Sequence, residues 1–329
     1  MGSQPARLPC GLWVHVMTPL LVVPPAPARW PALEDLLRHK GQPWLGDMQQ
    51  RLVRGVPGAQ DVFAVMPAGS QLLGSATVNK YGDLGVLAHC YVRPEHRERG
   101  LMHRLLETAL SWFDMTGGHW LFLGTTADLE VGLYGKHGFE PLRRMPWTPH
   151  DRVTMLRRGR GVTGKPYADA GGAVEIREIG RAEWPAMVAL LQYRPGLDPR
   201  VALDESAVSA ELFTLDLIDH QERGAYRLLG AFRGSRLVGL ATLATERPGE
   251  RTHAMLVPHT DAPAELRAAI EALAHDRGYA HVEFPMEALA ATAQPAAVRA
   301  EPPPEAGQKL ESAPEGASPP PAAPPETAR

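Results

Sequence analysis

The segment from Cys90 to His103, CYVRPEHRERGLMH, combines residue types that suit an anion-binding corner. An extended run ends at Val92, a proline follows, and Gly100 precedes an amphipathic helical pattern. The first turn of a helix presents unpartnered N–H groups and a partial positive charge, and glycine lets a pyrophosphate approach the backbone closely. Arg97 and Arg99 add positive charge. The spacing predicts a phosphate site here, and the alternative is a structural turn with solvated arginines.

The same corner resembles a signature of the GNAT acetyltransferases. Residues 92–102, VRPEHRERGLM, are similar to the family's acyl-CoA-binding motif V-x-P-x-x-[RQ]-x-x-G-x-[GA]. Residues 133–139, LYGKHGF, are similar to its L-Y-x-x-x-G-F, and the two motifs stand in the family's order. The resemblance covers about residues 10–157. Met102 departs from the motif's glycine or alanine, and we expect a loop that lies slightly farther from the phosphates but still binds them.

The resemblance implies an N-acetyltransferase that uses acetyl-CoA as co-substrate and an amine, on a small molecule or a protein, as acceptor. The backbone amides from Arg97 to His103 would then hold the CoA pyrophosphate, and the strand end would pair with pantetheine. The implied CoA-binding residues are Tyr91, Val92, Arg97, Glu98, Arg99, Gly100, Leu101, Met102 and His103.

Acyl transfer from a thioester to an amine requires a neutral amine and a stabilised thiolate. An alkylammonium group of pKa about 10.4 loses its proton at a cost of roughly 4–5 kcal/mol at pH 7. The resemblance puts the phenol of Tyr134 beside the CoA sulfur, where a pKa near 10 keeps it protonated as the acid. His89, on the strand before the corner, is the candidate base. The structural alternatives are a packed aromatic and a packed histidine, and Cys90 is expected to be a buried strand residue, since direct transfer needs no acyl-enzyme.

These residues require a mixed α/β unit to position them. Leucine, alanine and phenylalanine recur at one-face helical spacing after Gly100, and a Gly117-Gly118 pair ends that pattern. The expected elements, in chain order, are a strand at 12–17, helices at 28–39 and 44–54, strands at 61–66, 71–79 and 84–92, a helix at 100–115, a strand at 119–126, a helix at 128–137, and strands in FEPLRRM and RVTMLRR.

The chain also repeats itself. ARWPALEDLL at 28–37 is echoed by AEWPAMVALL at 182–191, and SQLLGSAT at 70–77 is echoed by SRLVGLAT at 235–242. Such self-similarity predicts one supersecondary plan used twice. The fold class is therefore expected to be α/β, with two tandem GNAT-like copies of which the second is incomplete. The second copy lacks both motifs, so we expect it not to bind CoA.

The boundaries follow from composition. We expect an active GNAT domain at 1–158, a glycine-rich linker at 159–173, a degenerate GNAT-like domain at 174–287 and a disordered tail rich in Pro and Ala at 288–329. Trp30 and Trp184, at equivalent helix starts, are expected to anchor each helix on its own sheet. The second copy should contain a strand from 174, helices at 182–191, near 204–220 and at 263–277, a three-strand meander at 225–257 and a strand at 280–284.

Composition excludes several classes of protein. With 329 residues, 22% of them charged, and a formal charge of −3, the chain offers no basic field for nucleic acid. Two cysteines are too few for a disulfide framework, which favours a reducing cytoplasm. No run approaches the roughly 18 apolar residues of a membrane span, and neither HExxH nor CxxC occurs, so neither a membrane nor a metal is expected.

Two other classes of function stay open beside the enzyme. One is a catalytically lapsed CoA-binding module with a regulatory or interaction role, and the other is a purely structural interaction protein. The presence of Gly100 and Tyr134 favours a CoA-binding enzyme over the structural protein.

Overall fold

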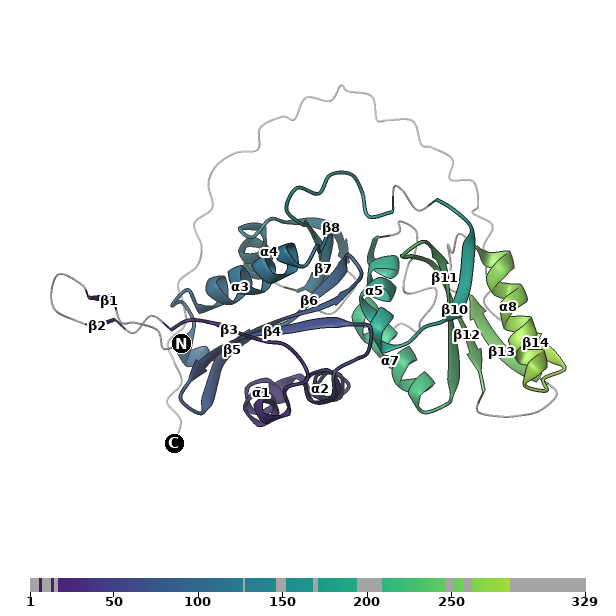
Figure 1. Ribbon diagram of the computed structural model, residues 1–329, viewed down its shortest axis with the longest axis horizontal. Helices are drawn as coiled ribbons and strands as arrows, with labels where there is room; N and C mark the ends of the chain where they lie inside the picture. The colour runs from purple at the N-terminus through teal and green to yellow at the C-terminus, as the bar shows by residue number, and fades with distance from the viewer. Residues whose placement is uncertain are drawn as a thin grey trace, which may run out of the picture.

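Two β-sheets with helices around and between them form the core of this protein (Figure 1). The computed structural model describes residues 6–7, 13–14, 17–126, 128–145, 152–167, 171–193, 209–245, 251–256 and 262–284. The expected disordered tail at 288–329 lies outside the described residues, as do parts of the expected strand at 12–17 and of the expected helical region at 204–220.

The first sheet has seven strands in the order β3-β4-β5-β6-β7-β9-β8. Its neighbours are antiparallel except for β6 and β7, which run parallel. The strands are β3 (Leu20–Val22), β4 (Gln60–Ala68), β5 (Gln71–Tyr81), β6 (Leu84–Val92), β7 (Trp120–Thr125), β8 (Phe139–Met145) and β9 (Arg152–Arg158). A separate short pair joins β1 (Ala6–Arg7) to β2 (Trp13–Val14).

Helices cover both faces of this sheet (Figure 1). On one face lie α3 (Leu101–Met115) and α4 (Asp128–Gly135), and on the other lie α1 (Trp30–Leu37) and α2 (Trp44–Gln49). The one-face leucine pattern of α3 is buried as expected, because Leu105, Leu106 and Phe113 pack on the sheet. A 3-10 turn flanks α1 at each end, and a π-helical turn at 50–54 continues α2.

The second sheet has five strands in the order β10-β11-β12-β13-β14. Its first three pairings are antiparallel and its last is parallel, as in the first five strands of the larger sheet. The elements of this second unit are β10 (Val174–Glu178), α5 (Trp184–Tyr193), α7 (Ala210–Glu222), β11 (Tyr226–Arg233), β12 (Arg236–Ala244), β13 (Arg251–Leu256), α8 (Pro263–Asp276) and β14 (His281–Glu283).

Helix α5 joins the two units because it packs between their sheets (Figure 1). It lies against β5, β6 and β7 on one side and against β12 on the other. Trp184 is fully buried, and its cluster contains Phe122 of the first unit and Phe232 of the second. Trp184 therefore packs on its own sheet, as expected, and also on the sheet of the first unit, which the sequence did not predict. Trp30 is half-buried beside the core under α1.

Buried ion pairs cross the same junction. The guanidinium of Arg181 donates to Asp47 at 2.6 Å, and Arg51 donates to the Arg181 carbonyl oxygen at 3.1 Å. Arg51 also bonds Asp47 at 2.8 Å. Removing one member would leave a buried charge without its partner, which destabilises a protein strongly. The two units therefore share both an apolar core and a charge network.

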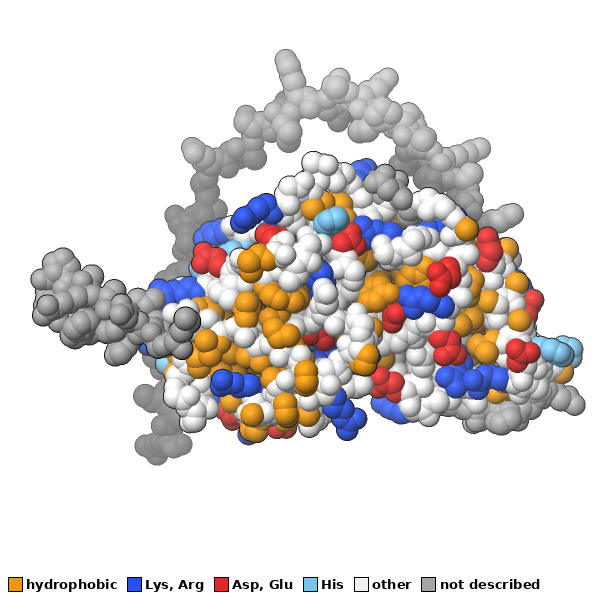
Figure 2. Space-filling view, viewed as in Figure 1, with side chains coloured by type: hydrophobic (Ala, Val, Ile, Leu, Met, Phe, Trp, Pro, Cys, Tyr) orange, Lys and Arg blue, Asp and Glu red, His pale blue; other side chains and the backbone are white. Residues whose placement is uncertain are grey.

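The outer surface is mixed. In the view of Figure 2, apolar side chains gather over the first sheet, and charged side chains are more frequent over the second unit. Among the described residues, the exposed large apolar side chains are Leu20, Leu21, Val23, Met115 and Leu142. No helix within the described ranges is both long and apolar enough to cross a bilayer.

Candidate active site

The strand-to-helix corner has the backbone geometry that its sequence predicts. β6 ends at Val92, a 3-10 turn follows at 94–96, and α3 begins immediately after Gly100. Gly100 has φ +71°, a left-handed conformation that L side chains rarely adopt, and a Cβ placed there would meet nothing within 4 Å. The glycine is therefore required by its φ, and the space beside it is open.

The first turn of α3 points its amides at this corner. The N–H of Arg104 makes the first intrahelical bond, to the carbonyl of Gly100 at 3.3 Å, so the N–H groups of residues 101–103 precede the helical ladder. The amide of Arg97, the first of the expected binding amides, donates to the Pro94 carbonyl at 3.2 Å in this structure. The Nε of Arg97 donates to the Val92 carbonyl at 3.1 Å.

β6 leaves one edge open towards this corner. It pairs with β7 only from Leu84 to Val86, so residues 87–92 have no strand partner on that side among the described residues. On the other side, the register with β5 shifts between Ser75 and Thr77, and His89 in this bulge has φ +52°. The open edge beside Tyr91 therefore offers backbone groups to an extended ligand, which matches the pairing expected for pantetheine.

A groove of about 780 Å³ runs along this open edge. Its walls come from the end of β6, the corner before α3 and helix α4. Of the nine expected CoA-binding residues, the eight that line it are Tyr91, Val92, Arg97, Glu98, Gly100, Leu101, Met102 and His103. Arg99 does not line it, although it lies in the same loop. A volume of this size lies within the usual range for ligand and cofactor sites.

Tyr134 closes one side of the groove. Its side chain is 9% exposed, and its ring packs edge-on against Phe139. Burial raises the pKa of Tyr134 well above its ordinary value of 10, with the neighbouring Cys90 adding to the shift. Burial likewise raises the pKa of the half-buried Cys90 to about 12. Both groups therefore stay protonated at neutral pH.

His89 lies on the opposite face of β6 from the groove. Its ring packs edge-on against Trp44 of α2, 5.4 Å between centroids, and its Nε2 is buried without a hydrogen-bond partner. Burial lowers the pKa of His89 to about 3. The imidazole is therefore neutral and only weakly basic at neutral pH, which does not favour the expected base role.

Residues 30–139 match the family model described as the acetyltransferase (GNAT) family. This span contains the corner, the groove and Tyr134. The amino-terminal unit is a GNAT-family acetyltransferase domain. None of the curated proteins compared with the chain matches it.

Solved structures resemble the GNAT domain at low sequence identity. The ribosomal-protein-S18-alanine N-acetyltransferase of Escherichia coli is 16% identical, with 44% of this chain covering 100% of that one at a TM-score of 0.36. An acetyltransferase from Thermus thermophilus is 17% identical. The match covers 44% of this chain and 99% of that one, at a TM-score of 0.34. An aminoglycoside 6'-N-acetyltransferase complexed with coenzyme A is 19% identical. The match covers 42% of this chain and 96% of that one, at a TM-score of 0.34.

The structure adds residues to the GNAT groove that the sequence analysis missed. Glu130 lines it one helical turn before Tyr134 and accepts a hydrogen bond from the Thr125 hydroxyl. The i, i+4 spacing of Glu130 and Tyr134 on α4 is the signal that could have found it. At the corner, His103 Nδ1 lies 2.9 Å from His137 Nε2, and burial lowers the pKa of His137. No cluster of three metal-ligating side chains occurs among the described residues.

Proposed function

We propose that this protein transfers the acetyl group of acetyl-CoA directly to a primary amine. The observation that carries the proposal is one groove in which an open strand edge, the first turn of a helix and a protonated phenol meet. The GNAT match covers the same residues. An amine on a small molecule or on a protein would serve as acceptor.

Binding is assigned to the backbone. The N–H groups of residues 101–103, at the positive end of α3, hold the pyrophosphate. The unpaired edge of β6 at residues 90–92 pairs with the pantetheine amides as another strand would. The left-handed Gly100 allows the chain to turn between these two sites without a side chain in the groove.

The chemistry then needs one acid. The thioester supplies an activated acyl carbon, to which the amine nitrogen bonds while the carbon–sulfur bond breaks. Tyr134, which its raised pKa keeps protonated at neutral pH, donates its hydroxyl proton to the departing sulfur, and solvent then returns a proton to the phenolate. With a pKa of about 3, His89 is a weak acceptor for the proton of the amine, so we assign that proton first to solvent.

A catalytically lapsed CoA-binding module is the second candidate. The weak basicity of His89 favours it, since the groove then lacks the base that the sequence suggested. The two candidates differ in turnover and agree in CoA binding.

One experiment separates them. The full chain is incubated with acetyl-CoA and a panel of primary amines, mono-, di- and polyamines and peptides with a free amino terminus, and thiol release is followed. Calorimetry with CoA runs in parallel. We expect amine-dependent thiol release, whereas CoA binding without release for any amine would support the lapsed module. The absence of CoA binding would contradict both.

A further inference from the structure

A second cavity, of about 640 Å³, lies where the two units and the segment between them meet. Its walls come from residues 117–120 after α3, residues 160–166 and the β11–β12 turn at 233–236. It adjoins Trp120, the first residue of β7, whereas the CoA groove lies near the other end of that strand. The two sites are therefore separate.

The carboxylates beside this cavity are already engaged. Asp114 accepts two bonds from Arg157, at 2.9 and 2.7 Å, and a third from the Arg160 amide at 3.3 Å. Asp83 is held by Arg236 at 2.5 Å and lies 2.8 Å from the Nδ1 of His119. The negative charge that borders the cavity is thus matched by residues of the protein.

Two of the cations that line the cavity have no counter-ion. Arg160 and Lys165 line it, and no carboxylate of the part of the chain described lies within ion-pair distance of either. This local excess of positive charge stands out in a chain of formal charge −3. Arginine and lysine are the side chains that bind phosphate groups best, the first through paired N–H bonds and the second as a compact charge.

The backbone around the cavity leaves room for a ligand. Gly117, Gly161 and Gly234 all have left-handed φ values, +73°, +77° and +58°, and a Cβ on any of them would meet nothing within 4 Å. The N–H groups of residues 117–120, 160 and 162 already donate to acceptors within the protein, so side-chain cations rather than the backbone would hold a ligand here. One wall is tightly packed, because a Cβ on Gly159 would collide with the Gly118 carbonyl oxygen.

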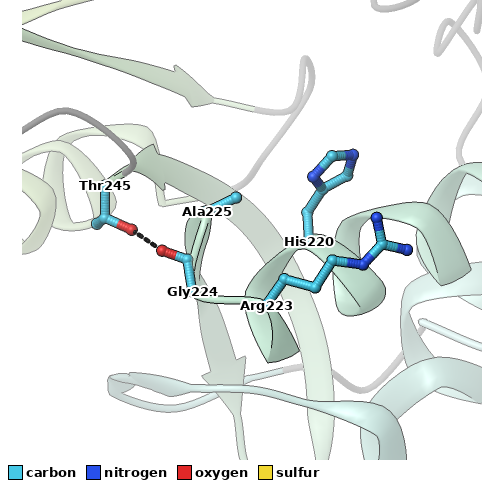
Figure 3. Close-up of a pocket in the computed structure, with 5 residues that line it drawn as sticks. All are labelled: His220, Arg223, Gly224, Ala225 and Thr245. Atoms are coloured by element: carbon cyan, nitrogen blue, oxygen red, sulfur yellow. Dashed lines mark hydrogen bonds between the residues drawn. The ribbon is translucent and has the colours of Figure 1, made fainter.

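A third pocket, in the second unit alone, lacks these properties (Figure 3). Its volume is about 400 Å³, and its one arginine, Arg223, lies 4.0 Å from Asp219. The hydroxyl of Thr245 donates to the Gly224 carbonyl at 2.6 Å, as the dashed line in Figure 3 marks. Its polar groups are thus largely matched within the protein, so it serves as the control for the junction cavity.

We propose that the junction cavity binds a small phosphate-bearing anion, held by Arg160 and Lys165 beside the β11–β12 turn of the second unit. Because the ligand would contact the segment at 160–166 and both sheets' ends, its binding would tighten the junction. Anion binding in this cavity does not depend on acetyl transfer, so the experiment below tests it separately from the proposed function.

Pyrophosphate is the probe, and the melting temperature of the full chain is the readout. Pyrophosphate could also occupy the CoA groove, so the titration is done in the Gly100→Asp variant, in which that groove is blocked. If this variant does not fold, wild-type protein saturated with CoA takes its place. A ligand at about 100 times its Kd is expected to raise Tm by on the order of 5 °C. Arg160→Ala and Lys165→Ala should each weaken binding about tenfold by calorimetry, while Arg223→Ala should leave it unchanged.

Comparison ligands test the chemistry of the anion. ATP should bind at least as well as pyrophosphate. A guanidinium pairs with carboxylates as well as with phosphates, so much weaker binding of citrate is the result that would assign the cavity to phosphate. Equal binding of citrate would overturn the phosphate assignment. The proposed site would be overturned if pyrophosphate bound neither the Gly100→Asp variant nor the CoA-saturated wild type. It would also be overturned if Arg160→Ala and Lys165→Ala left pyrophosphate binding unchanged.

Discussion

The five strands of the second sheet pair in the same order as the first five of the larger sheet, yet among the described residues only the larger sheet has the groove that we propose for CoA. Both contain three antiparallel pairings followed by a parallel one, and both have a register shift at the same place, before Pro67 in one and before Phe232 in the other, 165 residues apart. The difference lies at the following helix. The first turn of α3 has no acidic residue. The first turn of α8 contains Glu265, whose negative charge offsets the positive charge at that end of the helix and disfavours a bound anion. The strand order thus provides the frame, and the local sequence of one turn provides the anion site.

The repeated tryptophans give the largest expected effect. Trp184→Ala removes a fully buried ring from a core that both sheets share, and it should lower the free energy of unfolding by about 4 kcal/mol. Trp30→Ala removes a half-buried ring and should cost about 1–2 kcal/mol. Urea denaturation measures both. Equal losses of unfolding free energy would show that Trp184 and Trp30 stabilise the protein equally, and that the position of α5 between the two sheets adds nothing.

The sequence predicted most of this architecture because periodicity and turn residues are local signals. The helix pattern after Gly100 and the strand patterns on either side match α3, β6 and β7 within about a residue or two. The shared position of α5 was missed, although residues 184–190 are all buried, a sign of a helix surrounded by core. That the second unit is a degenerate GNAT-like copy stays a prediction.

The candidate active site was predictable from the sequence only in the part that is formed by backbone groups. Gly100 and the amides of α3 follow from a turn motif, and the structure agrees with them. The depressed pKa of His89 was not predictable, because it results from burial beside Trp44, a residue 45 positions away in the chain. Long-range packing of this kind leaves no local pattern.

Gly100→Asp tests whether the anion site depends on this corner. The new carboxylate would face the groove and repel the phosphates, and we expect CoA affinity to fall at least about 100-fold, through charge repulsion and lost space together. Gly278→Asp is the matched control, since Gly278 after α8 also has a left-handed φ, +82°, with nothing within 4 Å of an added Cβ, and lines neither cavity. Calorimetry that finds the same loss in both variants would assign the effect to backbone strain.

Tyr134→Phe separates catalysis from binding. Phenylalanine keeps the packing against Phe139 but has no proton to donate, so turnover should fall about 100-fold while the Kd of CoA stays within about twofold. The second unit has no described residue aligned with Tyr134, since its sheet ends at β14. Steady-state kinetics and calorimetry measure the two quantities, and unchanged turnover would remove the acid role.

We expect His89 to make the first sheet sensitive to acid. The described strands of the second sheet contain no buried histidine, and Ala254 occupies the position 165 residues after His89. The folded-state pKa of His89 is about 3, below the ordinary 6.5, so its contribution to stability is complete above about pH 6.5 and is lost as the pH falls towards 3. Between pH 7.5 and pH 5 this residue should account for a loss of about 2 kcal/mol. Urea denaturation at both pH values should show that loss reduced in His89→Gln and unchanged in a control, His253→Gln, whose side chain is 67% exposed on β13. An equal acid sensitivity in wild type and His89→Gln would mean that the imidazole is not buried beside Trp44 in solution, and the contrast between the two sheets would then rest on the α3 corner alone.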